Sequence, residues 1–308
     1  MKPHFHIGPV TVAVAATSAN LGPGFDALGL ALDLEDEVTA RVTEHGITVA
    51  VTGEGADEVP IDGSHLIVST MRRTFAALGS PPPPGLAITC HNRIPHARGL
   101  GSSSAAIVAG IILARALVER TGEVDELRLA AEIEGHPDNV AACLLGGFTI
   151  AWTDSSGARA VRLRPAPGLH PTVYIPTTKG LTAYARAALP PAVPHADAAF
   201  NAGRAALLVH ALTSEPSLLL SATEDRLHQD YRAPGMPETA ALVRSLRRDG
   251  VPAFVSGAGP SVLALPLGAP PEAPDGWCAR SLSVSLTGAR ILIARHAEGD
   301  PVAAGPPS

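Results

Sequence analysis

The sequence predicts a protein of mixed helices and strands that folds into two domains. Its 308 residues are enough to bury a proper hydrophobic core. Spacing typical of strands and spacing typical of helices follow one another along the chain. Residues 154–167 are rich in Gly, Pro and Arg, which indicates a hinge. We therefore expect one domain over residues 1–155, a second over residues 156–296, and a flexible tail over residues 297–308.

The first half of the chain is predicted to begin with strands. Residues 10–16 alternate apolar and small side chains, as strands do. Residues 37–42 and 46–52 are predicted as two further strands around a hairpin. Further along we expect a helix over residues 65–78, a strand over 85–90, a long helix after residue 101, a helix over 124–134 and a strand over 148–152.

The second half is predicted to combine short strands with several helices. A loop passes into a helix within residues 177–186, and prolines at positions 190 and 191 end that helix. Further helices are expected over residues 200–212, 217–228 and 237–249. Strands are expected over residues 172–175, 251–255, 262–265, 281–287 and 290–295.

Composition excludes some classes of protein. The formal net charge of −6 disfavours a nonspecific nucleic-acid binder, which needs basic patches. Cys90, Cys143 and Cys278 are too widely spaced for a disulfide framework or a metal pair. We expect each of them to be a small, buried hydrophobic residue. The sequence shows neither a signal peptide nor a long apolar span, so we expect no membrane association and a cytoplasmic location.

A glycine- and serine-rich turn leads directly into the long central helix. Gly99, Gly101 and the serines at 102–104 precede a run of Ala, Ile and Leu. Helix N-termini leave N–H groups unpaired and carry a partial positive charge, and glycines let an anion approach the backbone. The turn is therefore a candidate phosphate site. An ordinary buried helix with a serine N-cap is the alternative.

Three other segments place polar side chains in turns. Asn20 and Asp26 follow the first strand, although turns use these residues for local hydrogen bonds as well. Residues 134–139 read Glu-Gly-His-Pro-Asp-Asn, and the proline breaks the helix there; a capping or surface role is the alternative for His136. Residues 256–261, Ser-Gly-Ala-Gly-Pro-Ser, form either a second anion-binding turn or a plain hairpin turn.

Together these four segments resemble the GHMP small-molecule kinase superfamily. Residues 95–105 are similar to its ATP-phosphate motif, and residues 256–261 to its C-terminal glycine loop. Residues 18–26, Ser-Ala-Asn-Leu-Gly-Pro-Gly-Phe-Asp, and residues 134–139 resemble the homoserine kinase branch. The galactose and mevalonate branches instead carry a Gly-Glu-His pattern that this sequence lacks. The four segments keep the family order between positions 17 and 265.

The resemblance implies an α+β fold of two domains with the active site between them. The N-terminal domain would be like ribosomal protein S5, and the C-terminal domain ferredoxin-like. The implied activity is transfer of the ATP γ-phosphoryl group to the side-chain hydroxyl of L-homoserine, giving O-phospho-L-homoserine on the way to threonine. The implied ligands are ATP, Mg²⁺ and L-homoserine, and relatives often form homodimers.

The resemblance also implies roles for individual residues. Asn139, Glu134, Ser103 and Arg186 would act in the transfer step, and Glu134 with Ser103 would hold Mg²⁺. The amino-acid substrate would be bound by Asn20, Asp26, His136, Asp138, Arg186 and Arg232, with the two arginines on its carboxylate. The nucleotide would be bound by Pro95, His96, Ala97, Arg98, Gly99, Leu100, Gly101, Ser102, Ser103, Ser104, Ala105, Gly257 and Gly259.

Some assignments stay open at this point. Glu132 competes with Glu134 as the metal ligand, and Ser104, where relatives often have alanine, leaves open which hydroxyl meets the metal. Arg98 either contacts a phosphate or faces water. Other branches place an aspartate at the position of Asn139 as a proposed base, and an amide cannot take a proton. We therefore expect positioning and charge stabilisation to carry the reaction without a protein base.

Rival functions make different predictions. A GHMP kinase for another alcohol is the nearest rival. A serine hydrolase is weaker because no Gly-x-Ser-x-Gly elbow is present. A ligand-sensing protein that has lost turnover would be expected to lack site residues, whereas the expected residues are all present. Walker and protein-kinase motifs do not occur.

Overall fold

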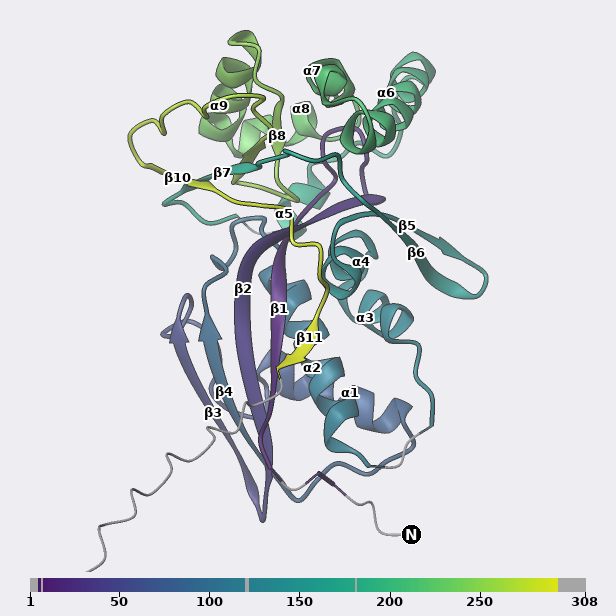
Figure 1. The fold of residues 1–308 in the computed structure, drawn as a ribbon, viewed down its shortest axis with the longest axis vertical. Coiled ribbons are helices and arrows are strands. Elements are labelled where there is room, and N and C mark those ends of the chain that lie inside the picture. The colour runs from purple at the N-terminus through teal and green to yellow at the C-terminus, as the bar shows by residue number, and fades with distance from the viewer. Residues whose placement is uncertain (1–4, 7, 120–121, 181, 293–308) are drawn as a thin grey trace, which may run out of the picture.

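The computed structural model describes residues 5–6, 8–119, 122–180 and 182–292, so the tail predicted for 297–308 lies outside the described residues. Two sheets, each covered by helices, make up the chain (Figure 1). The mixed α+β class inferred from the sequence is confirmed. None of the described helices is both long enough and apolar enough to cross a bilayer.

The larger sheet is built mainly from the first half of the chain. Its central path runs β11-β1-β2-β4-β3. The bounds are β1 Val10–Ala19, β2 Leu28–Thr43, β3 Gly46–Gly53, β4 Gly85–Asn92 and β11 Arg290–Leu292. A side branch, β5 (Phe148–Asp154) with β6 (Gly157–Leu163), pairs with the beginning of β2.

The predicted hairpin between the second and third strands is wrong. β4 pairs with β2 along residues 85–91 and separates it from β3, which runs parallel to β4. Leu86, Ile88 and Cys90 make β4 apolar enough for a central place, whereas β3 buries little and suits an edge. A parallel pair needs a crossover, and α1 (Leu66–Ala77) supplies it.

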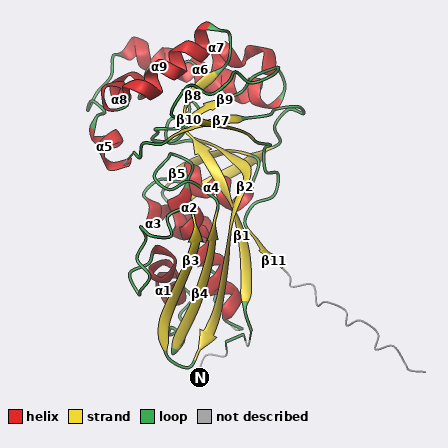
Figure 2. Ribbon diagram, turned by 90° about the vertical axis from the view of Figure 1, so that its left-hand side faces the viewer, coloured by secondary structure: helices red, strands yellow, loops and turns green. Residues whose placement is uncertain are grey.

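Four helices cover one face of the larger sheet (Figure 2). Besides α1 they are α2 (Ser102–Leu117), α3 (Glu126–Glu134) and α4 (Asp138–Leu145). α2 is apolar almost all round and lies at the centre of the core, as a helix with that composition must. Gly110 brings it close to α1, because a Cβ there would lie 2.9 Å from a Thr70 side-chain carbon.

The smaller sheet is antiparallel, in the order β10-β7-β9-β8. Its strands are β7 Thr172–Pro176, β8 Ala253–Val255, β9 Val262–Ala264 and β10 Trp277–Ser281. α9 (Pro237–Arg248) packs on it through a small core that contains Tyr174, Leu246 and Val262. α5 (Thr182–Ala187) and α6 (His195–Thr213) complete this part together with the short helices below.

The helix predicted over residues 217–228 is broken in the structure. It is replaced by η1 (Pro216–Leu218), α7 (Leu219–Ala222), a turn, α8 (Gln229–Arg232) and η2 (Ala233–Gly235). The Asp225 carboxylate accepts the N–H groups of residues 227, 228 and 229 and so removes them from any helical ladder. This turn places His228 and Arg232 beside the larger domain.

The sheets do not follow the division expected at residues 155/156. β6 pairs with β5 in the larger sheet, so the presumed hinge at 154–167 is mostly a β-hairpin. The chain returns to that sheet in residues 284–292, where Val284 bridges Leu32 and β11 pairs with β1. Only residue 281 of the strand predicted over 281–287 lies in a named strand. Cys90 and Cys143 are buried as expected, but Cys278 is exposed.

Candidate active site

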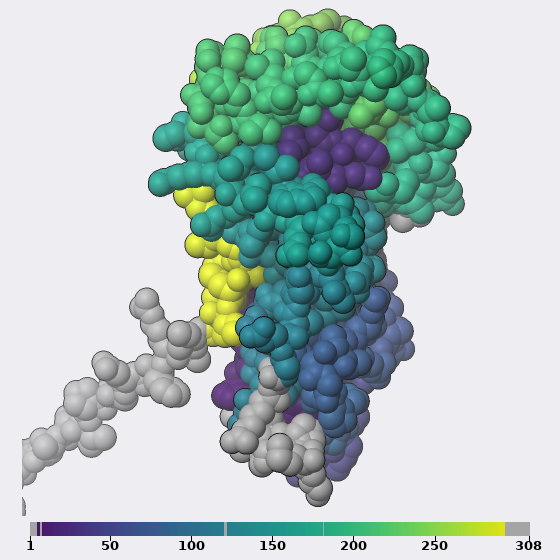
Figure 3. Space-filling model, turned by 90° about the vertical axis from the view of Figure 1, so that its right-hand side faces the viewer, coloured from purple at the N-terminus to yellow at the C-terminus, as the bar shows by residue number. Residues whose placement is uncertain are grey.

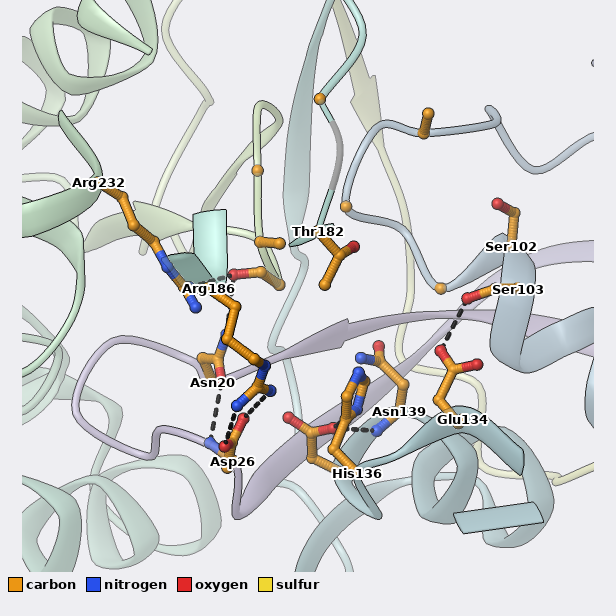
Figure 4. Close-up of a pocket in the computed structure, with 18 residues that line it drawn as sticks. Asn20, Asp26, Ser102, Ser103, Glu134, His136, Asn139, Thr182, Arg186 and Arg232 are labelled. Carbon is orange, nitrogen blue, oxygen red and sulfur yellow. Dashed lines mark hydrogen bonds and ion pairs between the residues drawn. The ribbon is translucent and has the colours of Figure 1, made fainter. Parts of the chain in front are cut away.

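The four motif segments meet at one cavity of about 250 Å³ between the two sheets (Figure 4). The turn after β1, the loop before α2, the α3–α4 junction and the β8–β9 turn each contribute to its wall. The predicted site residues that line it are Asn20, Asp26, Ala97, Gly99, Gly101, Ser102, Ser103, Glu134, His136, Asp138, Asn139, Arg186, Arg232, Gly257 and Gly259.

The loop before α2 needs glycine at two positions. Gly99 and Gly101 both have φ of 71°, in the left-handed region. A Cβ on Gly101 would lie 2.0 Å from the Thr17 hydroxyl, and one on Gly99 would lie 2.2 Å from the Ser256 carbonyl oxygen. Gly101 is also the N-cap of α2 and makes no side-chain cap bond. The serine N-cap alternative is therefore excluded, and the first-turn N–H groups of α2 begin beside the cavity.

Some predicted loop residues do not line this cavity. Leu100 and Ala105 are buried in the core. The Arg98 guanidinium donates to the carbonyl oxygens of Pro176, His96 and Thr177 at 3.0, 2.8 and 2.7 Å. Its side chain thus fastens the loop to the end of β7, which corrects the expectation of a phosphate contact or a free position in water. Pro95 lies with it at another surface hollow.

Glu134 is the acid placed at the cavity. It is the last residue of α3, and its Oε1 accepts hydrogen bonds from the hydroxyls of Ser103 and Ser104, both at 2.7 Å. Its competitor Glu132 pairs with Arg128 at 3.1 Å, where both side chains are about half exposed. Glu134 lines the cavity beside the serines, whereas Glu132 pairs with Arg128 away from it, so the structure favours Glu134 as the candidate metal ligand. Ser103 lines the cavity, whereas Ser104 is fully buried and does not.

His136 and Asp138 form a pair at the start of α4. His136 Nδ1 lies 2.8 Å from Asp138 Oδ1, and the same oxygen accepts the Asn139 N–H at 2.8 Å. Burial alone would lower the pKa of His136. The hydrogen bond and charge of Asp138, with further charge from Glu134 and Asp26, outweigh it and raise that pKa. His136 thus lines the cavity, and its side chain is only 15% exposed.

The Asn139 side chain is fixed by a residue that sequence reasoning missed. The buried Thr17 hydroxyl donates to Asn139 Oδ1 at 2.8 Å. Asn139 therefore keeps its NH₂ group as a donor at the cavity wall. Thr17 ends an apolar stretch of β1, and nothing in the local sequence distinguishes it from other strand-end threonines.

Asp26 and Arg186 form a bidentate ion pair across the cavity (Figure 4). The guanidinium nitrogens lie 2.9 and 2.8 Å from the two carboxylate oxygens, and this contact raises the pKa of Arg186. Asn20 holds the turn: its Nδ2 donates to Gly257 O at 2.8 Å, and its Oδ1 accepts the Asp26 N–H at 3.0 Å. Asn20 therefore has the local turn role as well as a place in the wall.

Arg232 is a buried cation whose partners are all neutral. It is 3 % exposed, and it donates to Ala185 O at 3.1 Å, His228 Nδ1 at 3.1 Å and Gly257 O at 3.4 Å. Burial and the nearby Arg186 lower its pKa. Within the described part of the chain no carboxylate oxygen lies within 4.0 Å of it. A buried charge without a counter-charge indicates a site for an anionic ligand.

A second cavity of about 310 Å³ opens on the other side of the phosphate-type loop. It shares Ala97, Ser102 and Ser103 with the first, and His96 also lines it. Its remaining lining is mostly apolar and comes from β1, β2, β4, the loop residues 58–60 and the beginnings of α1 and α2. The two cavities thus offer a polar and an apolar compartment on the two sides of one loop.

The fold and this site define a small-molecule kinase of the GHMP class. The family model "GHMP kinases N terminal domain" matches residues 65–147, and "GHMP kinases C terminal" matches residues 198–280. A homoserine kinase from Streptomyces avermitilis is 56% identical, over 94% of this chain and 98% of that one. One from Mycobacterium tuberculosis is 50% identical, over 83% of each.

Structural comparison agrees with the sequence relatives. The crystal structure of homoserine kinase from Cytophaga hutchinsonii superposes with a TM-score of 0.80 at 26% identity, covering 92% of this chain and 97% of that one. The chain belongs to the homoserine kinase family.

Proposed function

We propose that this chain transfers the γ-phosphoryl group of ATP to the side-chain hydroxyl of L-homoserine. One observation carries the proposal: the glycine loop, the carboxylate of Asp26 and the guanidinium of Arg232 all line one cavity. Among the described residues the Arg232 guanidinium has no carboxylate partner. A free amino acid carries one ammonium and one carboxylate, so it needs both signs of charge. The glycine loop supplies backbone donors for the phosphates.

ATP is proposed to lie across the loop. Its phosphates would meet the first turn of α2 near Gly101 and Ser102, and the apolar second cavity would take the adenine. The shared wall at Ala97, Ser102 and Ser103 supports this arrangement, because it connects the two compartments. The turn with Gly257 and Gly259 closes the far side of the first cavity.

The residues fit a Mg²⁺ ion held jointly with the nucleotide. Mg²⁺ prefers oxygen ligands and usually takes one or two carboxylates, waters and substrate phosphates. Glu134 and Ser103 offer such a partial set, and among the described residues no group of three or more His, Cys, Asp or Glu forms a complete cage. When bound, the ion would neutralise phosphate charge.

The substrate is proposed to exchange partners with an existing ion pair. Asp26 and Arg186 neutralise each other in the structure. A homoserine ammonium would take the place of the guanidinium at Asp26, and the homoserine carboxylate would bind the released Arg186 together with Arg232. The number of paired charges would rise, because the substrate carboxylate would give Arg232 a negatively charged partner. His136 and Asp138 would orient the hydroxyl end.

Positioning would carry the transfer. Phosphoryl transfer depends mainly on alignment and on stabilisation of charge. Asn139 offers an NH₂ donor fixed by Thr17, and an amide cannot serve as a base. We therefore propose that the chain aligns the hydroxyl without a dedicated protein base. We also place the enzyme in the cytoplasm; a homodimer stays a prediction for sedimentation analysis.

The test is coupled ADP release with four alcohols under the same conditions, namely L-homoserine, L-threonine, mevalonate and galactose. Mg²⁺-dependent turnover of L-homoserine alone supports the proposal. Comparable turnover of another alcohol contradicts the substrate, and ATP binding without turnover of any of them favours a sensor.

A further inference from the structure

His228 is a buried histidine that the proposed chemistry does not use. Its side chain is 0% exposed and does not line the substrate cavity. Nε2 lies 2.8 Å from the Gly22 carbonyl oxygen, and Nδ1 lies 3.1 Å from Arg232 Nη1. A carbonyl oxygen only accepts, so these partners assign the proton to Nε2 and leave the Nδ1 lone pair for the arginine.

The surroundings keep this imidazole neutral. Burial lowers its pKa, and the positive charge of Arg232 adds to that effect against the opposing charge of Asp225. Asp225 faces it at 3.6 Å, but its Oδ2 already accepts the N–H groups of His228 and Gln229. The ring therefore acts as one donor and one acceptor.

The Gly22 end of this contact belongs to the turn that carries Asp26. Figure 3 shows this early segment, in purple, reaching in among the green helices of the C-terminal part. Pro23 O accepts a hydrogen bond from Asn201 at 2.7 Å. The Phe25 ring stacks on His228 with centroids 5.2 Å apart, and the Arg232 guanidinium carbon lies 5.3 Å from the Phe25 centroid.

We propose that His228 is a positioning residue that sets the spacing between Arg232 and Asp26, the two groups that would bind the ends of the amino acid. It joins them through one rigid ring: Nδ1 to the guanidinium, Nε2 and the ring face to the turn. This inference rests on the proposed function, because it assigns Arg232 to the substrate carboxylate.

The arginine needs such a partner because three acidic groups attract it. Asp26, Asp225 and Asp138 all act on Arg232 through their charge, and each could draw a long, rotatable side chain out of place. The acceptor at Nδ1 holds Nη1, while Nε is held by Ala185 O. Removing only the imidazole acceptor should therefore release one edge of the guanidinium.

The test compares His228→Leu, His228→Asn and the exposed control His210→Leu. The leucine variant should raise the KM for L-homoserine by about 10-fold, as expected for a lost hydrogen bond to a charged group, with the KM for ATP unchanged. Asparagine places its Oδ1 where Nδ1 lies, so His228→Asn should recover most of the loss. His210 is 54% exposed, and its variant should match wild type.

Two further measurements separate positioning from stability. If His228 acts through Arg232, adding His228→Leu to Arg232→Met should cost no more than Arg232→Met alone. The inference is overturned if the two substitutions raise the KM for L-homoserine independently, so that their fold-changes multiply. It is also overturned if the leucine variant has an unchanged KM, or if the asparagine variant is no better than the leucine variant. Calorimetric titration with L-homoserine measures affinity apart from turnover. Wild type that binds but does not transfer contradicts the proposed function alone, and wild type that does not bind overturns both.

Discussion

Replacing Arg232 with alanine would remove a buried cation at the cavity whose hydrogen-bond partners are all neutral. In the proposed complex its free edge makes charge-assisted hydrogen bonds to the substrate carboxylate. Truncating one member of a buried, hydrogen-bonded charge pair costs about 2–5 kcal/mol. Because Arg186 would still bind the carboxylate, we expect a loss in the lower half of this range, about 2–3.5 kcal/mol. The KM for L-homoserine should rise on the order of 30- to 300-fold.

The assay is steady-state ADP release with each substrate varied in turn. The KM for ATP should stay within about a factor of two, because Arg232 lies across the cavity from the α2 loop. Arg128→Ala, which removes an exposed pair with Glu132, is the matched control and should change neither constant. A variant that binds ATP poorly but uses homoserine normally would refute the assignment of Arg232 to the carboxylate.

Three other substitutions test separate parts of the structure. Glu134→Gln should abolish Mg²⁺-dependent transfer in the ADP assay while Glu132→Gln stays active; the reverse pattern would move the metal role to Glu132. Burial raises the pKa of Asp36 to about 6, so the folded state binds more protons than the unfolded state between pH 4 and 6, and stability falls as pH rises through that window. In the wild type the free energy of unfolding should therefore fall by about 2–3 kcal/mol between pH 4 and 7, and Asp36→Asn should remove this fall in urea unfolding. An unchanged pH slope would contradict this. Gly101→Ala should weaken ATP binding or lower Tm far more than Gly46→Ala, since both glycines have positive φ but only Gly101 has a neighbour in the way. Equal losses in the two variants would contradict this prediction, because they would show that the positive φ alone, and not the close contact at Gly101, sets the cost.

The sequence was most informative where chemistry is carried by short segments. Asn20, Asp26, Glu134, His136 and Asn139 could be selected because each lies in a polar turn that interrupts apolar elements, and the structure brings them to one cavity. The end of α3 followed for the same reason, because Gly135 caps it as the helix predicted over residues 124–134 requires. α4, which begins after Pro137, was not predicted.

What the sequence did not predict depends on partners far away in the chain. Arg98 could not be placed because its acceptors, Pro176 and Thr177, lie almost 80 positions later. The contact of His228 with Gly22 spans 206 positions. Strand order failed similarly: adjacency along the chain favours a hairpin, whereas the competition between β3 and β4 for the place beside β2 is decided by burial.

The late return of the chain to β1 has a topological consequence. Between β6 and β11 the chain builds the smaller sheet, and β11 then pairs with residues 11–13 on the far side of β1. The second lobe is thus an insertion within the first, tied at both ends. A fragment that stops after β10 would leave residues 11–13 of β1 without their strand partner on that side, and such unpaired edge groups are prone to pair with another chain. Cutting this enzyme between its lobes would therefore divide one folding unit and not release two.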